Sequence, residues 1–158
     1  MRRPLLLSAA LLGVVAGLRT QVPGAVLAAR DLEPTDGPLA LLGTGVGKRV
    51  AYLGAVGELI ADKLPATPSR VEQAQLIGRV LGGVLAAASL ASATGVRGAR
   101  LILPAVVGGA GAWAGSWGGY LARKAAVERT GLPDPVVAVA EDLLAVGLAL
   151  AAVPDPQR

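Results

Sequence analysis

Several versatile residue types are missing from this chain. Its 158 residues include no Cys, no His and no Phe, and only 16% are charged. The absence of Cys and His excludes disulfides, thiol nucleophiles, His general bases and nearly all zinc, haem or iron–sulfur ligation. We therefore expect no cofactor, and any chemistry must come from carboxylates, hydroxyls, Lys and Arg. With aromatic residues at 3%, base-stacking surfaces for nucleic acid are not expected either.

The scarcity of charge indicates a membrane protein. Hydrophobic residues make up 53% of the chain, whereas a soluble domain carries about a quarter charged residues. The long uncharged runs predict an all-α polytopic membrane bundle of about five transmembrane helices in one domain. The alternative interpretation of the first run is a signal peptide. The spans are expected at residues 4–20, 48–64, 74–94, 101–121 and 135–153.

Local signals mark where these spans begin and end. Ser69 with Glu72 three residues later is typical of a capping box that starts the third span. Asp134 is the expected N-cap of the fifth span, with Pro135 at its first helical position. The run "GTGVGKR" before the second span does not have the spacing of a phosphate-binding loop.

The distribution of Lys and Arg predicts an orientation. Eight basic residues fall on one side of the predicted spans and five on the other, which favours a cytoplasmic N-terminus and an outside C-terminus in the inner cell membrane. The larger group is Arg2, Arg3, Lys63, Arg70, Arg79, Arg123, Lys124 and Arg129, and the smaller is Arg19, Arg30, Arg97, Arg100 and Arg158.

Small residues recur at helical spacing in the fourth span. Gly111, Gly115 and Gly119 follow one another every four residues and form a ridge that lets helix backbones approach closely. We expect this ridge to face another helix and the protein to form a homo-oligomer. The alternative is chance, because the chain contains 22 Gly.

Four carboxylates fall inside predicted spans. Glu58 and Glu141 lie at similar depths from one face, roughly 9–11 Å at the rise of an α-helix, and Asp62 and Asp142 lie beside them. Buried carboxylates must be paired, protonated, hydrated or metal-bound. We predict a proton or cation site, with an internal salt-bridge cluster as the alternative and the identity of any metal left open. The basic residues expected as charge partners or anionic lipid headgroup contacts are Arg19, Lys63, Arg70, Arg79, Arg123 and Lys124.

Four segments resemble the bacterial membrane-protein family catalogued as domain of unknown function 4126. They are "AGLRT" from Ala16, "GELIADKLPATPSR" from Gly57, "GGYLARK" from Gly118 and "GLPDPVVAVAED" from Gly131. The resemblance covers nearly the whole chain. It implies a small multi-pass membrane protein and assigns no activity.

Three classes of function remain open from the sequence. The leading hypothesis is a small transporter or channel-like protein whose carboxylates bind a proton or cation. The alternative is a non-transporting structural or anionic-lipid-binding module, and the third is an intramembrane metal-dependent enzyme, disfavoured because no nucleophile–base pair is found. Five spans also allow an inverted repeat, in which the first two and last two helices enter the membrane in opposite senses.

Overall fold

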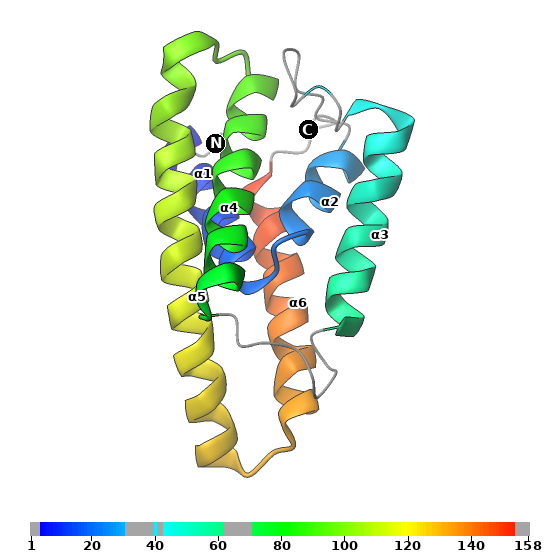
Figure 1. Ribbon diagram of the computed structural model, residues 1–158, viewed down its shortest axis with the longest axis vertical. Coiled ribbons are helices and arrows are strands. Elements are labelled where there is room, and N and C mark those ends of the chain that lie inside the picture. The colour runs from blue at the N-terminus through cyan, green and yellow to red at the C-terminus, as the bar shows by residue number, and fades with distance from the viewer. Residues whose placement is uncertain (1–3, 31–39, 41–42, 62–70, 154–158) are drawn as a thin grey trace.

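The computed structural model describes residues 4–30, 40, 43–61 and 71–153, and in these ranges the chain is helical without strands (Figure 1). The all-α prediction is therefore confirmed. The helices are α1 (Leu5–Leu18), α2 (Val22–Ala29), α3 (Gly45–Ala61), α4 (Gln73–Ala93), α5 (Ile102–Thr130) and α6 (Asp134–Ala152), with a short 3-10 helix η2 (Gly98–Leu101) before α5.

The first predicted span is one arm of a hairpin. Arg19 adopts an extended backbone conformation at the end of α1, and Pro23 lies in the first turn of α2. Proline favours a helix start and cannot continue a preceding helix, because it lacks the N–H and its ring clashes with the turn before it. The chain turns between Arg19 and Gln21, and α2 leads back toward the end from which α1 started (Figure 1).

This turn reverses the predicted sense of α1 relative to α5. Gly13 packs on Gly108, and Gly17 packs on Ala112 and Ser116, so residue numbers rise together along the contact and the two helices are parallel. The predicted inverted repeat requires them to run in opposite senses and is therefore wrong. The physical reason is the hairpin, because α2 returns the chain before α3 begins.

The hairpin also changes where the first helix begins relative to where the last helix ends. The start of α1 and the end of α6 point toward the same end of the molecule (Figure 1), whereas the charge count placed them on opposite sides. Arg2 and Arg3 lie outside the described residues. The predicted orientation depended on counting the start of α1 on the same side as the basic residues after α5. Because α1 runs parallel to α5, this count no longer supports that orientation.

Small residues bring α1, α4 and α5 into close contact. A Cβ atom on Gly111 would lie 2.6 Å from the carbonyl oxygen of Ala10, and one on Gly115 would overlap the backbone of Val14. From α4, a Cβ atom on Gly83 would lie 2.6 Å from the carbonyl oxygen of Gly108 in α5. These contacts lie within one chain. Homo-oligomerisation therefore stays a separate prediction.

Two predicted helix starts shift by a few residues. Pro133 is the N-cap of α6 and Asp134 is its first residue, so the N-cap prediction was wrong by one position. Glu72 is the N-cap of α4, while Ser69 of the predicted capping box lies outside the described residues. Helix α5 continues past residue 121 and ends at Gly131, whose φ of 66° gives the left-handed C-cap that glycine tolerates best.

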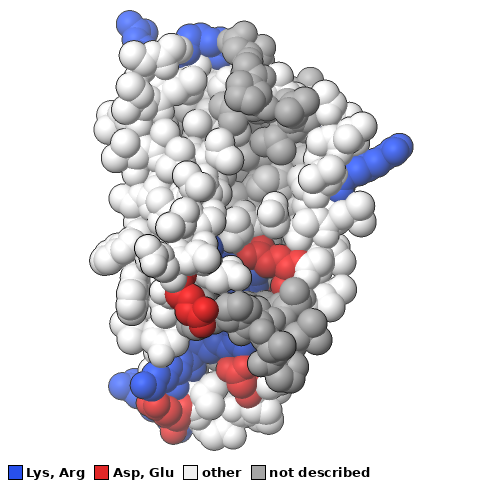
Figure 2. Space-filling view, viewed as in Figure 1, with Lys and Arg blue, Asp and Glu red and all other residues white. Residues whose placement is uncertain are grey.

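The surface is apolar and several charges are buried. Large side chains such as Val50, Leu53 and Trp113 are exposed, whereas Arg19 and Arg79 are 0% and 4% exposed. On the face in Figure 2, Lys and Arg lie mostly near the two ends. Among the described residues, α4 and α6 are long and apolar enough to cross a membrane. This supports a membrane location, and the five-span topology stays a prediction.

Candidate functional site

The break between α1 and α2 leaves backbone groups without partners inside a helix. At the end of α1 these include the carbonyl oxygens of Gly17 and Leu18, and before α2 they include the N–H groups of Thr20 and Gln21. In apolar surroundings each unpaired group costs several kcal/mol. Side chains from neighbouring helices bond all four groups.

Arginine side chains bind the carbonyl end of the break. Nη1 of Arg79, from α4, donates to the carbonyl oxygens of Gly17 at 3.0 Å and Leu18 at 2.8 Å. Nη1 of Arg19 also donates to Leu18, at 2.8 Å. Positive charge is favoured here because the C-terminal end of a helix carries partial negative charge.

A carboxylate binds the amide end of the break. Glu58 of α3 accepts the N–H of Thr20 on Oε1 at 2.7 Å and the N–H of Gln21 on Oε2 at 2.8 Å. This is the favoured position for an anion, because the start of a helix presents N–H donors and partial positive charge. Arg79 joins the two ends of the break, since its Nη2 lies 3.7 Å from Oε1 of Glu58.

Two acidic residues of α6 complete the cluster through Arg19. Its Nε donates to Oδ1 of Asp142 at 2.6 Å, and its Nη2 lies 3.7 Å from Oε2 of Glu141. Glu141 also lies 3.8 Å from Nη1 of Arg123, which holds Asp134 through two hydrogen bonds of 2.8 and 2.5 Å. Positive and negative side chains therefore alternate from Arg123 on α5, through Glu141 on α6, to Arg19 at the break.

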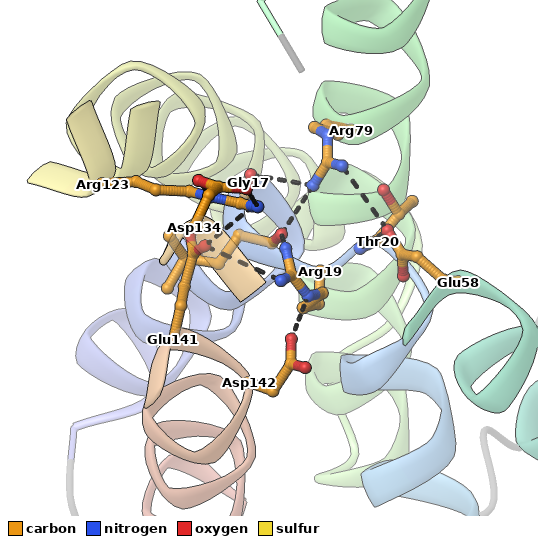
Figure 3. Close-up of polar contacts among 10 residues, drawn as sticks. Gly17, Arg19, Thr20, Glu58, Arg79, Arg123, Asp134, Glu141 and Asp142 are labelled. Carbon is orange, nitrogen blue, oxygen red and sulfur yellow. Dashed lines mark hydrogen bonds and ion pairs between the residues drawn. The ribbon is translucent and has the colours of Figure 1, made fainter. Parts of the chain in front are cut away.

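Three of the four predicted carboxylates contact arginines of this cluster. Glu141 and Asp142 both contact Arg19, although their side chains point about 100° apart around the helix, because Arg19 lies between them. Together with the ion pair between Glu58 and Arg79, these contacts match the salt-bridge alternative for all three residues. Glu58 lies on the other side of the break (Figure 3). Asp62, the fourth carboxylate, lies outside the described residues.

Some of the predicted basic partners form ion pairs, and others lie outside the described residues. Arg79 and Arg123 form ion pairs with acidic residues, whereas Lys63 and Arg70 lie outside the described residues. Lys124 is exposed on α5. Arg19 was predicted on the opposite side from Glu141, and the structure contradicts this because the chain turns back directly after Arg19.

Sequence reasoning missed two contributors to the site. Asp134 was assigned only a capping role, and its pairing with Arg123 follows from the tight connection between α5 and α6. The role of the Thr20 and Gln21 amides depends on the hairpin itself. Pro23 was the one available signal, because it indicates a new helix start directly after a buried basic residue.

The described residues form no cluster of three Asp or Glu that could hold a metal ion. The carboxylates face guanidinium groups, which meet their charge directly.

An open pocket adjoins the amide end of the break. It has a volume of about 320 Å³ and lies where the start of α2 meets α3 and α4. Its lining residues are Thr20, Gln21, Gly54, Glu58, Gln75 and Gly78. The side chain of Glu58 is 16% exposed, so its carboxylate is within reach of small molecules that enter the pocket.

Comparison with known proteins gives one match. The sequence model of a family described as "Domain of unknown function (DUF4126)" matches residues 6–157. No curated protein and no solved structure matches the chain.

Proposed function

We propose that this chain, which belongs to the family described as domain of unknown function 4126, is a small multi-pass membrane transporter in which Glu58 binds a proton. The observation that carries the proposal is the open pocket that Glu58 lines at the break between α1 and α2. Broken helices beside a polar cavity are a recurring way to build a transport site, because the free helix ends bind charged groups.

The placement of charge supports a site inside a membrane. Arg19 and Arg79 are buried while large apolar side chains cover much of the outside, the reverse of what water-soluble proteins show. Ionisable residues within membrane segments are costly and face the protein interior, where they serve ion pathways or proton relays. The bundle would thus present its apolar surface to lipid and keep its charges around the hairpin.

Glu58 differs from the other two described carboxylates in its surroundings. Asp142 contacts the buried guanidinium of Arg19 at 2.6 Å, and Glu141 lies near two arginines. Glu58 likewise lies 3.7 Å from an arginine, Arg79, and accepts two backbone N–H groups, but it also lines the pocket, which Glu141 and Asp142 do not. We assign proton binding to Glu58, and we assign Glu141 and Asp142 to holding the hairpin through Arg19.

The test is proton flux in liposomes that contain the purified full-length protein and a pH-sensitive dye. Inward gradients of monovalent cations, divalent cations and small anions are imposed one at a time. We expect one gradient to drive proton movement, and Glu58→Gln to abolish it. Glu128→Gln is the matched control, because Glu128 is an exposed acidic residue near the end of α5. Flux unchanged by Glu58→Gln would contradict the proposal.

The second candidate is a non-transporting membrane module that binds anionic lipids. It is favoured by the arginine partners of Glu141 and Asp142, which leave these carboxylates no need of a transported ion. This module would give the flux of empty liposomes under every gradient, and it would retain anionic lipids in a salt-dependent way.

A further inference from the structure

Helix α3 has a small apolar contact with the rest of the molecule. It packs against α2 at the edge of the bundle (Figure 1). Of its described side chains, only Ala51 and Ala55 are buried, and Gly54 lies against the side chain of Gln21. Few side-chain atoms of α3 take part in this contact, so the dispersion energy that holds α3 in place is small.

Glu58 adds polar contacts that join α3 to two other parts of the chain. Its oxygens accept the N–H groups of Thr20 and Gln21 at 2.7 and 2.8 Å, and its Oε1 lies 3.7 Å from Nη2 of Arg79 on α4. Helix α2 itself contains no titratable side chain, and Arg19 in the preceding turn contacts the acidic residues of α6 instead. The contacts of Glu58 are charge-assisted, so they depend on the ionised carboxylate.

Protonation of Glu58 would weaken this connection and leave the hairpin intact. The hydroxyl oxygen of a neutral carboxyl group is a donor, so one backbone N–H loses its strong acceptor and the attraction to Arg79 falls. Arg79 keeps its hydrogen bonds to the carbonyl oxygens of Gly17 and Leu18, and it therefore stays with the hairpin when α3 moves. The two amides released by Glu58 face the open pocket, where water can bind them.

The pocket lies between the helices that this movement would separate. Its lining includes Gly54 and Glu58 from α3 and Gln75 and Gly78 from α4. The ion pair between Glu58 and Arg79 links these two walls. A Cβ atom on Gly78 would meet nothing within 4 Å, so α4 leaves room at this wall.

We infer that α3 is a movable wall of the pocket, held in place by the ionised Glu58 side chain and released when Glu58 takes up a proton. Release widens the pocket between α3 and α4. Helices α1, α4 and α5 keep their arrangement, because small residues bring their backbones into close contact, and Arg19 holds α6 through Asp142. This inference rests on the proposed proton binding by Glu58 and names its structural consequence.

Distances between pairs of spin labels on the full-length protein in lipid nanodiscs test the movement. The natural chain has no Cys, so labels can be attached to Cys residues introduced at exposed positions. The measured pair is Leu53→Cys on α3 with Val106→Cys on α5, and the control pair is Val106→Cys with Leu144→Cys on α6. Labelled protein is diluted with unlabelled protein, so that only distances within one chain are recorded.

Acid should move α3 and leave the control pair unchanged. We expect acidification from about pH 8 to about pH 4, which brackets the ordinary titration of carboxylates, to add a longer distance between α3 and α5. The increase should be about 5 Å, the size of a one-turn helix shift. Glu58→Gln should show the longer distance before acidification, because its amide is neutral, whereas Glu128→Gln at an exposed position of α5 should behave as the wild type does. The control pair reports movement of α6, which carries Glu141 and Asp142.

The results separate the movable wall from the transport role. An α3–α5 distance that neither acid nor Glu58→Gln changes overturns the inference, and so does an equal change in the control pair, because the whole bundle would then loosen. The acid experiment uses the native Glu58, so it decides the question if Glu58→Gln does not fold. The expected distances establish the movable wall even where liposomes show no flux, in which case the transport proposal alone fails. Flux that depends on Glu58 without any change in distance overturns the movement and leaves the proton site in place.

Discussion

Arg19 is the residue whose removal should harm the fold most. It is fully buried, and its guanidinium donates to Asp142 at 2.6 Å and to the carbonyl oxygen of Leu18 at 2.8 Å. Arg19→Met keeps a long apolar stem but leaves Asp142 as a buried carboxylate without this partner. Breaking a buried ion pair by removing one partner costs about 3–5 kcal/mol.

This loss is large beside the whole stability of a domain, which is about 5–15 kcal/mol. We therefore expect Arg19→Met to lower the free energy of unfolding by about 3–5 kcal/mol. Arg19→Lys should fall between wild type and Arg19→Met, because it keeps the charge but loses the planar fork that contacts Asp142 and Leu18 together.

A double-mutant cycle separates the ion pair from loss of packing. Asp142→Asn removes the charge of the partner at nearly constant shape, and the double variant should be about 1–3 kcal/mol more stable than the sum of the single losses. Unfolding in detergent can be followed through the fluorescence of Trp113 and Trp117, which lie on α5. A loss below about 1 kcal/mol for Arg19→Met, or strictly additive effects, would refute the reasoning.

Four further substitutions test other contacts. Gly115→Ala should cost about 1–3 kcal/mol in detergent unfolding because its Cβ would overlap α1, whereas Gly118→Ala on the same helix, with open space around it, should gain up to about 1 kcal/mol; equal effects would contradict the packing. Arg123→Gln should cost only roughly 0–1 kcal/mol, because its nearer partner Asp134 is 56% exposed and Glu141, 3.8 Å away, keeps Arg19 as a partner; a loss above about 3 kcal/mol would indicate a buried pair. Gly131→Ala should cost about 1–2 kcal/mol through its left-handed backbone, and an unchanged melting temperature would argue against that cap.

Much of the helical framework could be predicted from sequence, because it follows from local signals. Long apolar runs separated by Pro and Gly predict helices, and the observed α4 and α6 lie close to the ranges 74–94 and 135–153. The break after Arg19 was also visible, since Pro23 follows within a few residues. These signals do not specify the direction in which a helix runs through the bundle. Whether a short helix continues across the molecule or turns back depends on what it packs against.

The contact between α1 and α5 decides the direction. Gly13 and Gly17 lie against small residues of α5 in parallel register, and no local periodicity in α1 specifies this. The missing information on helix direction also explains why Arg19 was placed away from Glu141. Glu58 and Glu141 were singled out as acids within helices, and the structure places both near arginines. Arg19 was assigned to the opposite side from Glu141, because the sequence around Arg19 does not show that the chain turns back there. The partners of a buried charge come from tertiary structure.

The most direct test of the account is the sidedness of α1 in a membrane. The natural chain has no Cys, so single-Cys variants at Pro4, Ala99 and Leu132 can be labelled with a membrane-impermeant thiol reagent in oriented vesicles. These positions are exposed at the start of α1, between α4 and α5, and between α5 and α6. If α1 turns back at Arg19, Pro4→Cys and Ala99→Cys will label from one side and Leu132→Cys from the other. Labelling of Pro4→Cys together with Leu132→Cys would mean that α1 crosses in the opposite sense, and it would contradict the hairpin around which the site is built.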